Sequence, residues 1–322
     1  MAAGIGRALA VAAALFVSSG ALAQEFPQRP VRLITGSPGG TSDFSARYIA
    51  QKLGERWRQQ VVVDNRPAVG GIVAAEIVAK ANPDGHTLIV SGISVHATAQ
   101  HLIKRLPFDP LRDFAPVSNL THSGIVIVVV PTLPAQNLRE FIAYAKARTG
   151  GVNYASSVAG SSSHLAGELF NQLTGAGLVH IPYKGAGFSL TALMTAEVQS
   201  AFLATTTTNT QVKAGRLRAL ALLSEHRYPG MPEVPTAAEQ GYAGLESYVW
   251  FGLFAPARTP PALVARINRD VSAILRHPET LQAMLSQGAE PAPSSPEVFA
   301  AFVNSESAKW GRVIRAAKIE LQ

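Results

Sequence analysis

The sequence predicts an α/β protein with two domains, each a mainly parallel sheet flanked by helices, and a cleft between the domains. Three observations support this fold class. The 322 residues are enough for two domains with cores of their own. Short apolar runs alternate with helix-like segments, which is typical of parallel sheets with crossover helices. The alternation stops at a proline-rich bridge and then starts again, so the chain has two similar halves.

The composition excludes several other classes of protein. With 47% hydrophobic and 15% charged residues the chain is too apolar to be disordered, and its 27 glycines and 21 prolines exclude a coiled coil. The absence of cysteine excludes a small disulfide-stapled protein. The net charge of +7 suits an anionic partner, but the lysines and arginines are scattered. Nucleic acid is therefore not an expected partner.

The N-terminal segment, residues 1–23, resembles a secretory signal. Arg7 provides the positive charge, an apolar stretch runs from Ala8 to Val17, and Ala21-Leu22-Ala23 has the small-residue pattern of a cleavage site. A membrane anchor would need about 20 continuous apolar residues, and this stretch is shorter. We expect cleavage after Ala23 and a bacterial periplasmic location.

The first half of the chain contains three apolar strands separated by two helices. The strands are expected at Val31–Thr35, Val61–Asp64 and Thr87–Val90. Between them, Asp43–Leu53 and Ile72–Ala81 place apolar residues at helical spacing. This βαβαβ order predicts a parallel sheet with right-handed crossovers.

The second half repeats the alternation after an irregular bridge at Leu106–Pro116. Its expected strands and helices, in chain order, are Ile125–Val130, Asn137–Arg148, Val152–Ala155, His164–Leu173, Leu178–Ile181, Phe188–Thr195, Val198–Leu203 and Arg216–Leu223.

A second bridge, Tyr228–Pro235, precedes one more strand at Tyr248–Phe254. Three helices are expected after it, at Pro260–Arg276, Pro278–Gln287 and Pro296–Ala317. Because the two bridges divide the chain, we expect a discontinuous domain I of residues 24–120 and 225–322. Residues 121–224 form the expected domain II.

Two loops that follow strands are the main candidates for a binding site, because ligands of open α/β sheets lie beyond the carboxyl ends of the strands. The first loop, Ser37–Asp43, combines two glycines with hydroxyls at a helix start. The second, Ser156–Ser163, has hydroxyls and a glycine before the helix that begins at His164. The N–H groups of a first helical turn attract anions. We expect the two loops to bind one anionic group from opposite sides.

Three other loops are weaker candidates. Ser94 and His96 follow the third strand and could line the cleft. Lys184 could supply positive charge near the ligand, although a solvated lysine is the simpler interpretation. Arg66 could bind a carboxylate bidentately or pair with Asp64 instead.

Catalytic motifs are mostly missing from the sequence. It has no G-x-S-x-G elbow, Walker A loop, H-E-x-x-H or dinucleotide-binding G-x-G-x-x-G pattern. Ser161 and His164 lie one helical turn apart, so a hydrolase or lyase remains an alternative, but no carboxylate is evident to orient the histidine. No metal site and no cofactor are expected.

Many segments together resemble the Bug family, the substrate-binding proteins of tripartite tricarboxylate transporters. The matching segments cover essentially the whole chain after residue 23: Phe26–Ile34, Pro38–Asp43 with Ala46-Arg47, Val62–Pro67, Asn82–Leu88, Leu106–Pro110, Tyr154–Ser157, Gly160-Ser161, His164–Phe170, His180–Gly185, Trp250–Pro256 and Thr259-Pro260.

The resemblance implies a two-domain periplasmic binding protein of the type II-like Venus-flytrap kind, monomeric, which captures a small carboxylate for membrane transporter subunits. A receptor for a membrane signalling partner is an alternative role. Carried over by position, the implied ligand-binding residues are Ser37, Gly39, Gly40, Thr41, Ser42, Asp43, Ser94, His96, Ser157, Gly160, Ser161, His164, Lys184 and Ala204.

Three positions depart from the family pattern. Thr35-Gly36 stands in place of the usual Pro-Phe pair, Val158 in place of a glycine, and Leu203-Ala204 in place of a polar residue after the strand. We therefore expect the distal part of the ligand to be less polar or larger than a short acid such as aspartate.

Overall fold

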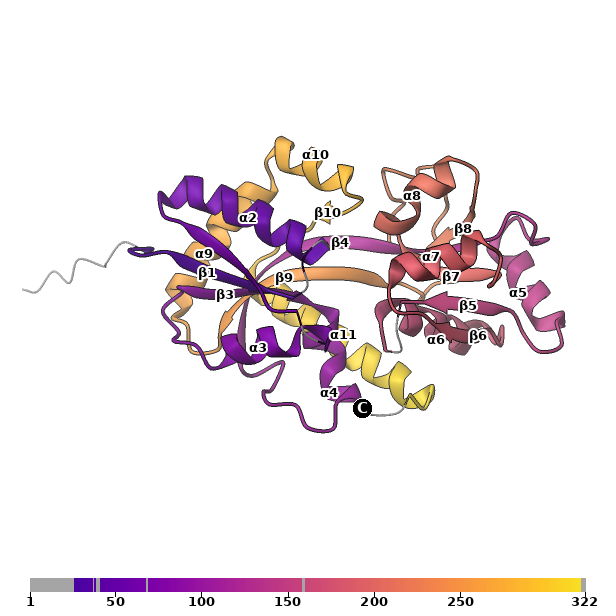
Figure 1. Cartoon of the computed structure of the whole chain (residues 1–322), viewed down its shortest axis with the longest axis horizontal. Coiled ribbons are helices and arrows are strands. Elements are labelled where there is room, and N and C mark those ends of the chain that lie inside the picture. The colour runs from indigo at the N-terminus through magenta and orange to yellow at the C-terminus, as the bar shows by residue number, and fades with distance from the viewer. Residues whose placement is uncertain (1–25, 37, 39–40, 68, 158–159, 320–322) are drawn as a thin grey trace, which may run out of the picture.

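The computed structural model describes residues 26–36, 38, 41–67, 69–157 and 160–319, and it has two lobes (Figure 1). A single path of hydrogen-bonded strands runs through both lobes in the order β2-β1-β3-β9-β4-β7-β5-β6. The α/β class and the two-domain architecture predicted from the sequence are confirmed. The sheet is mixed, because strands that connect the lobes pair in antiparallel fashion.

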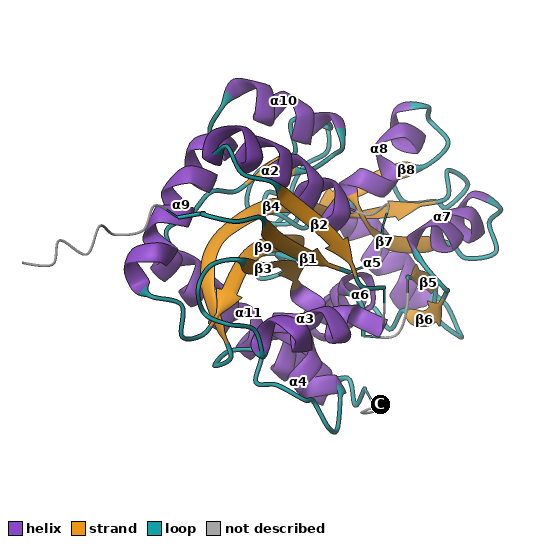
Figure 2. Ribbon diagram, turned by 60° about the vertical axis from the view of Figure 1, so that its left-hand side comes forward, coloured by secondary structure: helices purple, strands orange, loops and turns teal. Residues whose placement is uncertain are grey.

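The first lobe is built on β1, β2, β3 and β9. Strand β1 pairs in parallel with β2 and β3, as the βαβαβ pattern predicts, whereas β9 is antiparallel to β3. Helices α2 and α9 pack on one face of the sheet, and α3 and α11 on the other (Figure 2). The bounds are β1 Val31–Thr35, α2 Thr41–Trp57, β2 Val61–Asn65, η1 Val69–Gly71, α3 Ile72–Ala79, β3 Thr87–Gly92, η2 Ser94–Thr98, α4 Ala99–Leu102, β9 Tyr248–Pro256, α9 Pro261–Leu275, α10 Pro278–Ser286, β10 Glu290–Pro291 and α11 Pro296–Ala316.

The predicted apolar face of α2 is buried in the core of the first lobe. Ala46, Ile49, Ala50 and Leu53 recur at helical spacing and are at most 4% exposed. They belong to one cluster with apolar side chains of β1, β3 and α9. Burying this stripe fixes the start of α2 relative to the sheet.

The second lobe has the same plan on a smaller scale. Strand β5 pairs in parallel with β6 and with β7, and both β7 and β8 are antiparallel to β4. Helix α6 packs on β5 and β7, and α7 packs on the same two strands. The bounds are α5 Leu138–Ala147, β5 Asn153–Ser156, α6 Ser162–Thr174, β6 Val179–Pro182, α7 Ala186–Met194, β7 Ser200–Ala204, α8 Thr205–Lys213 and β8 Arg218–Leu222.

Strand β4, Phe114–Val129, connects the two lobes. Its first part, up to Gly124, pairs with β9, and its last part, from Ile125, pairs with β7 and β8. The return crossing lies at Ser247, whose carbonyl accepts the N–H of Ile125. The domain bounds at 120/121 and 224/225 stay predictions. The hydrogen bonds between Leu222 and residues 235–237 favour a later return boundary, close to Ser247.

Helix α11 contacts both lobes. It packs against β4 and η2 of the first lobe and also against α6 of the second. Its Glu306 is buried and accepts the indole N–H groups of Trp250, at 3.1 Å, and of Trp310, at 2.9 Å. In the described part of the chain, no helix is long and apolar enough to span a bilayer.

Candidate ligand-binding site

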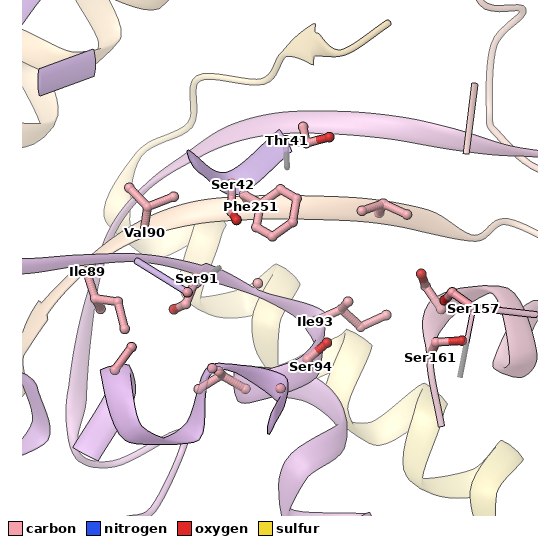
Figure 3. A pocket seen from close by; sticks show the side chains of 18 of the residues that line it. Thr41, Ser42, Ile89, Val90, Ser91, Ile93, Ser94, Ser157, Ser161 and Phe251 are labelled. Atoms are coloured by element: carbon pink, nitrogen blue, oxygen red, sulfur yellow. The ribbon is translucent and has the colours of Figure 1, made fainter. Parts of the chain in front are cut away.

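A cavity of about 730 Å³ lies between the lobes (Figure 3). Its walls come from the starts of α2 and α6, the end of β3, the Gly70-Gly71 turn, the start of α7 and strand β9. The lining residues are Gly36, Pro38, Thr41, Ser42, Gly70, Gly71, Ala74, Ile89, Val90, Ser91, Gly92, Ile93, Ser94, Val95, Ser157, Ser161, Ser162, Gly185, Ala186, Val249 and Phe251.

The first predicted loop reaches this cavity. Thr41 and Ser42, the first residues of α2, line it together with Gly36 and Pro38. The N–H groups of this first turn have no partners within the helix, so they and the two hydroxyls can bind an anion. Ser37, Gly39 and Gly40 were also predicted here, and they lie outside the described residues.

Asp43, the other predicted residue of this loop, does not line the cavity. It is 6% exposed and forms an ion pair with Arg47, at 3.0 Å. It also accepts an N–H of Asn65 at 2.8 Å, and the same Asn65 amide donates to the carbonyl of Gly36 at 3.3 Å. These contacts tie the end of β1 to the first turn of α2. Asp43 therefore has a structural role at the start of α2.

The second predicted loop reaches the opposite side of the cavity. Ser157 and Ser161 line it, on the far side from Ile89 and Val90 in Figure 3. Ser161 is the N-cap of α6, and its hydroxyl accepts the N–H of His164 at 3.3 Å. An N-cap of this kind leaves the other N–H groups of the first turn for a ligand. The two predicted loops thus meet at one cavity.

Gly160 and His164 are adjacent to this loop but do not line the cavity. Gly160 has a φ of 76°, and its N–H donates to Nδ1 of His164 at 2.9 Å. The His164 ring stacks on His180, with centroids 3.7 Å apart. Burial, and then the neighbouring His180, lower the pKa of His164 to about 3. His164 is therefore neutral at pH 7 and holds the backbone of Gly160.

The end of β3 provides the floor of the cavity. Ser91, Gly92, Ile93 and Ser94 line it, so Ser94 lies where the sequence predicts.

His96 does not line the cavity and is fully buried in the core. Its ring stacks on Phe254 at 3.7 Å, Nδ1 donates to the carbonyl of Pro110 and Nε2 accepts from Ser91. Burial lowers its pKa to about 4.

Two further predicted residues also lie off the cavity. Lys184 is exposed, while its neighbours Gly185 and Ala186 are in the lining. Ala204 is the residue before α8 and is only partly exposed. Arg66 forms an ion pair with Asp64 at 3.0 Å, the alternative to a ligand contact that its sequence neighbourhood allows.

Sequence reasoning missed the contribution of β9. Val249 and Phe251 alternate with the buried Trp250 and face the cavity, far along the chain from both loops. The only feature of the sequence that predicts this shared face is the alternation of side chains between the two sides of a strand. Gly70 and Gly71 carried a clearer signal, because adjacent glycines often adopt the positive φ values, 64° and 82°, that they show here.

The described lining of the cavity combines hydroxyls with apolar side chains and is uncharged. Among the lining residues that the structure describes there is no Asp, Glu, Lys, Arg or His. Among all described residues, no three potential metal ligands lie close enough to hold an ion. The chemistry that the lining offers is hydrogen bonding from hydroxyls and backbone N–H groups, next to apolar side chains.

Comparisons with known proteins identify the family. The tripartite tricarboxylate transporter family receptor matches residues 45–319. Protein BugT of Bordetella pertussis is 35% identical over 302 residues, which cover 93% of each chain. Among solved structures, an R. palustris protein with adipate has a TM-score of 0.80 at 34% identity, with 92% of this chain and 100% of that chain covered. MatC from Rhodopseudomonas palustris with bound malate has a TM-score of 0.74 at 32% identity, with 90% and 100% covered. The chain therefore belongs to the receptor family of the tripartite tricarboxylate transporters.

Proposed function

We propose that this chain is a periplasmic receptor that binds a small organic carboxylate between its lobes and delivers it to the membrane subunits of a tripartite tricarboxylate-type transporter. One observation carries the proposal: the N-termini of α2 and α6, with their hydroxyls, lie at the same cavity from opposite lobes. Adipate and malate in the two structural relatives support a carboxylate ligand. The proposed contact residues are Thr41, Ser42, Ser94, Ser157 and Ser161.

The proposed contacts are strong enough for a useful affinity without a cationic side chain. Each helix dipole contributes about 0.3–1 kcal/mol to an anion at its N-terminus. Each hydrogen bond to a charged group contributes about 1.5–3 kcal/mol. Four such bonds and two dipoles contribute about 7–14 kcal/mol. The upper part of this range exceeds the roughly 8 kcal/mol of a micromolar complex and leaves a margin for the cost of ordering the ligand.

We propose that the receptor releases its ligand unchanged. The alternative enzyme would use Ser161 and His164, but Nδ1 of His164 already accepts the Gly160 N–H, and its Nε2 lies 3.8 Å from Glu168. A histidine whose pKa is lowered to about 3 is also a weak general base at pH 7. Incubation with a bound carboxylate, followed by mass spectrometry, should recover only the starting acid; a converted product would overturn this proposal.

A bulky substitution at the cavity wall tests whether the ligand binds in this cavity. Ser161→Tyr places a bulky ring at the cavity wall, so thermal stabilisation by carboxylates should be lost. The melting temperature without ligand should fall by only a few degrees, because the N-cap hydrogen bond to His164 is lost. Ser305→Tyr, on an exposed turn of α11, is the matched control and should respond to ligand as wild type does. Equal ligand responses of the two variants would show that the ligand binds elsewhere.

We also propose that the chain is exported to the periplasm and that it is a monomer. The predicted cleavage after Ala23 should give a mature chain that begins at Gln24. N-terminal mass spectrometry of periplasmic protein checks the cleavage. Light scattering of the purified chain should give the mass of a monomer.

A further inference from the structure

The cavity has two chemically different parts. The hydroxyls of Thr41 and Ser42 lie at the start of α2, and those of Ser157 and Ser161 lie across the cavity at the start of α6 (Figure 3). Apolar side chains of β3 and β9, among them Ile89, Val90 and Phe251, line the side of the first lobe, and the Ser91 hydroxyl lies next to them (Figure 3). A ligand that contacts both parts must itself have a polar and an apolar end.

We infer that the ligand carries a single carboxylate on an apolar or aromatic body, an inference that rests on the proposed function. The carboxylate occupies the hydroxyl part between the helix N-termini. A second carboxylate would lie among Ile89, Val90 and Phe251, where the Ser91 hydroxyl already donates its proton to Nε2 of His96. No described lining residue carries a positive charge to pair with it. Because an unpaired charge loses its hydration when it is buried, diacids are disfavoured.

Gly36 leaves open space in the cavity. Apart from its neighbours in the chain, no atom of the described residues lies within 4 Å of the position that a Cβ of residue 36 would take, and the residue lines the cavity. The preceding Thr35 is fully buried, and its hydroxyl donates to the carbonyl of Val90 at 3.1 Å. Thr35 therefore points away from the cavity, and the size of residue 36 determines how long a ligand body fits.

Phe251 provides a flat apolar wall. It lies opposite Gly92 in the antiparallel pairing of β9 with β3. A Cβ on residue 92 would come within 3.1 Å of the Phe251 ring, so glycine at this position lets the ring lie close to β3. An aromatic ring placed in this way can stack on a planar ligand body.

The first test compares acids that differ only in the second carboxylate. Calorimetric titration of the purified protein with hexanoate and with adipate, which have the same number of carbon atoms, should show hexanoate binding at least about tenfold more tightly. Phenylacetate should also bind more tightly than malate. Equal or tighter binding of adipate and malate would overturn the inference and leave the proposed function intact. If no carboxylate binds to folded protein, the proposed function fails instead.

The second test changes the size of residue 36. Gly36→Phe should weaken phenylacetate and hexanoate binding at least about tenfold while acetate binding stays within about twofold of wild type. Gly36→Ala, which adds one methyl group to open space, is the matched control and should bind all these acids nearly as wild type does. Circular dichroism checks that both variants fold. Unchanged phenylacetate binding by folded Gly36→Phe would place the ligand body elsewhere and overturn the inference.

Discussion

Replacing Ser163 by alanine should weaken ligand binding although this side chain does not line the cavity. The Ser163 side chain is buried in the first turn of α6. It accepts the backbone N–H of Ser157 at 3.0 Å and lies 3.1 Å from the Ser157 hydroxyl and 2.9 Å from that of Ser161. One side chain thus holds both proposed ligand contacts of the second lobe.

The size of the effect follows from these contacts. A hydroxyl with three polar neighbours makes two or three hydrogen bonds, each worth about 0.5–1.5 kcal/mol net. If binding needs both serines held in place, the loss of about 1–2 kcal/mol raises the dissociation constant roughly 5- to 30-fold. The free energy of unfolding should fall by a similar amount, because the N–H of Ser157 loses its partner.

Ser200→Ala is the control that separates affinity from stability. Ser200 is also buried in the second lobe, but its hydroxyl donates to the carbonyl of Asn153 at the start of β5, whereas the loop follows the end of that strand. Both variants should unfold at lower urea concentration, and only Ser163→Ala should bind the ligand more weakly in calorimetric titration. Wild-type affinity in Ser163→Ala, or an equal loss in Ser200→Ala, would refute the reasoning.

Three further predictions concern stability and charge. His96, His122 and His180 have pKa values lowered to about 4 by burial and that of His164 is lowered to about 3, so the neutral forms of all four stabilise the fold above about pH 6.5. This stability is lost as the pH falls toward 4, by about 2 kcal/mol for each histidine at pH 5; urea unfolding at pH 7 and 5 measures it, and equal stability would contradict the assignment. Gly92→Ala should lower the free energy of unfolding by about 3 kcal/mol, because the added Cβ would lie 2.0 Å from the Trp250 carbonyl oxygen. Gly36→Ala is the control and should change the free energy of unfolding by less than about 0.5 kcal/mol. Lys184→Ala should change the dissociation constant by less than about twofold, since the side chain is exposed and off the cavity; a larger loss would restore Lys184 as a ligand contact.

Much of the fold could be predicted from local patterns. Strand β1 has the predicted bounds, and the predicted face of α2 is the buried one. The first part of β4 was missed because Pro116 and Gly124 are typical of loops, and only its pairing with β9 reveals a strand. Helix α8 was missed because it starts with four threonines, whose branched side chains disfavour helices.

The candidate site could be predicted only in part, because a sequence does not tell which way a polar side chain turns after a strand. Thr41, Ser42, Ser94, Ser157 and Ser161 line the cavity, as expected from their place beyond strand ends. The apolar wall from β9 could not be predicted, since its residues come from a distant part of the chain and meet the loops only through the antiparallel pairing of β9 with β3.

Asp43 and His164 show why a buried polar residue beside a binding loop is easily mistaken for a ligand contact. Each accepts a hydrogen bond within the protein: Asp43 from Asn65, whose amide also donates to the Gly36 carbonyl, and His164 from the Gly160 N–H. If both touched the ligand, a carboxylate would meet the negative charge of Asp43, which is unfavourable. Turned away from the cavity, they leave its lining uncharged, so an anion is held by N–H groups and hydroxyls whose positions these two side chains determine.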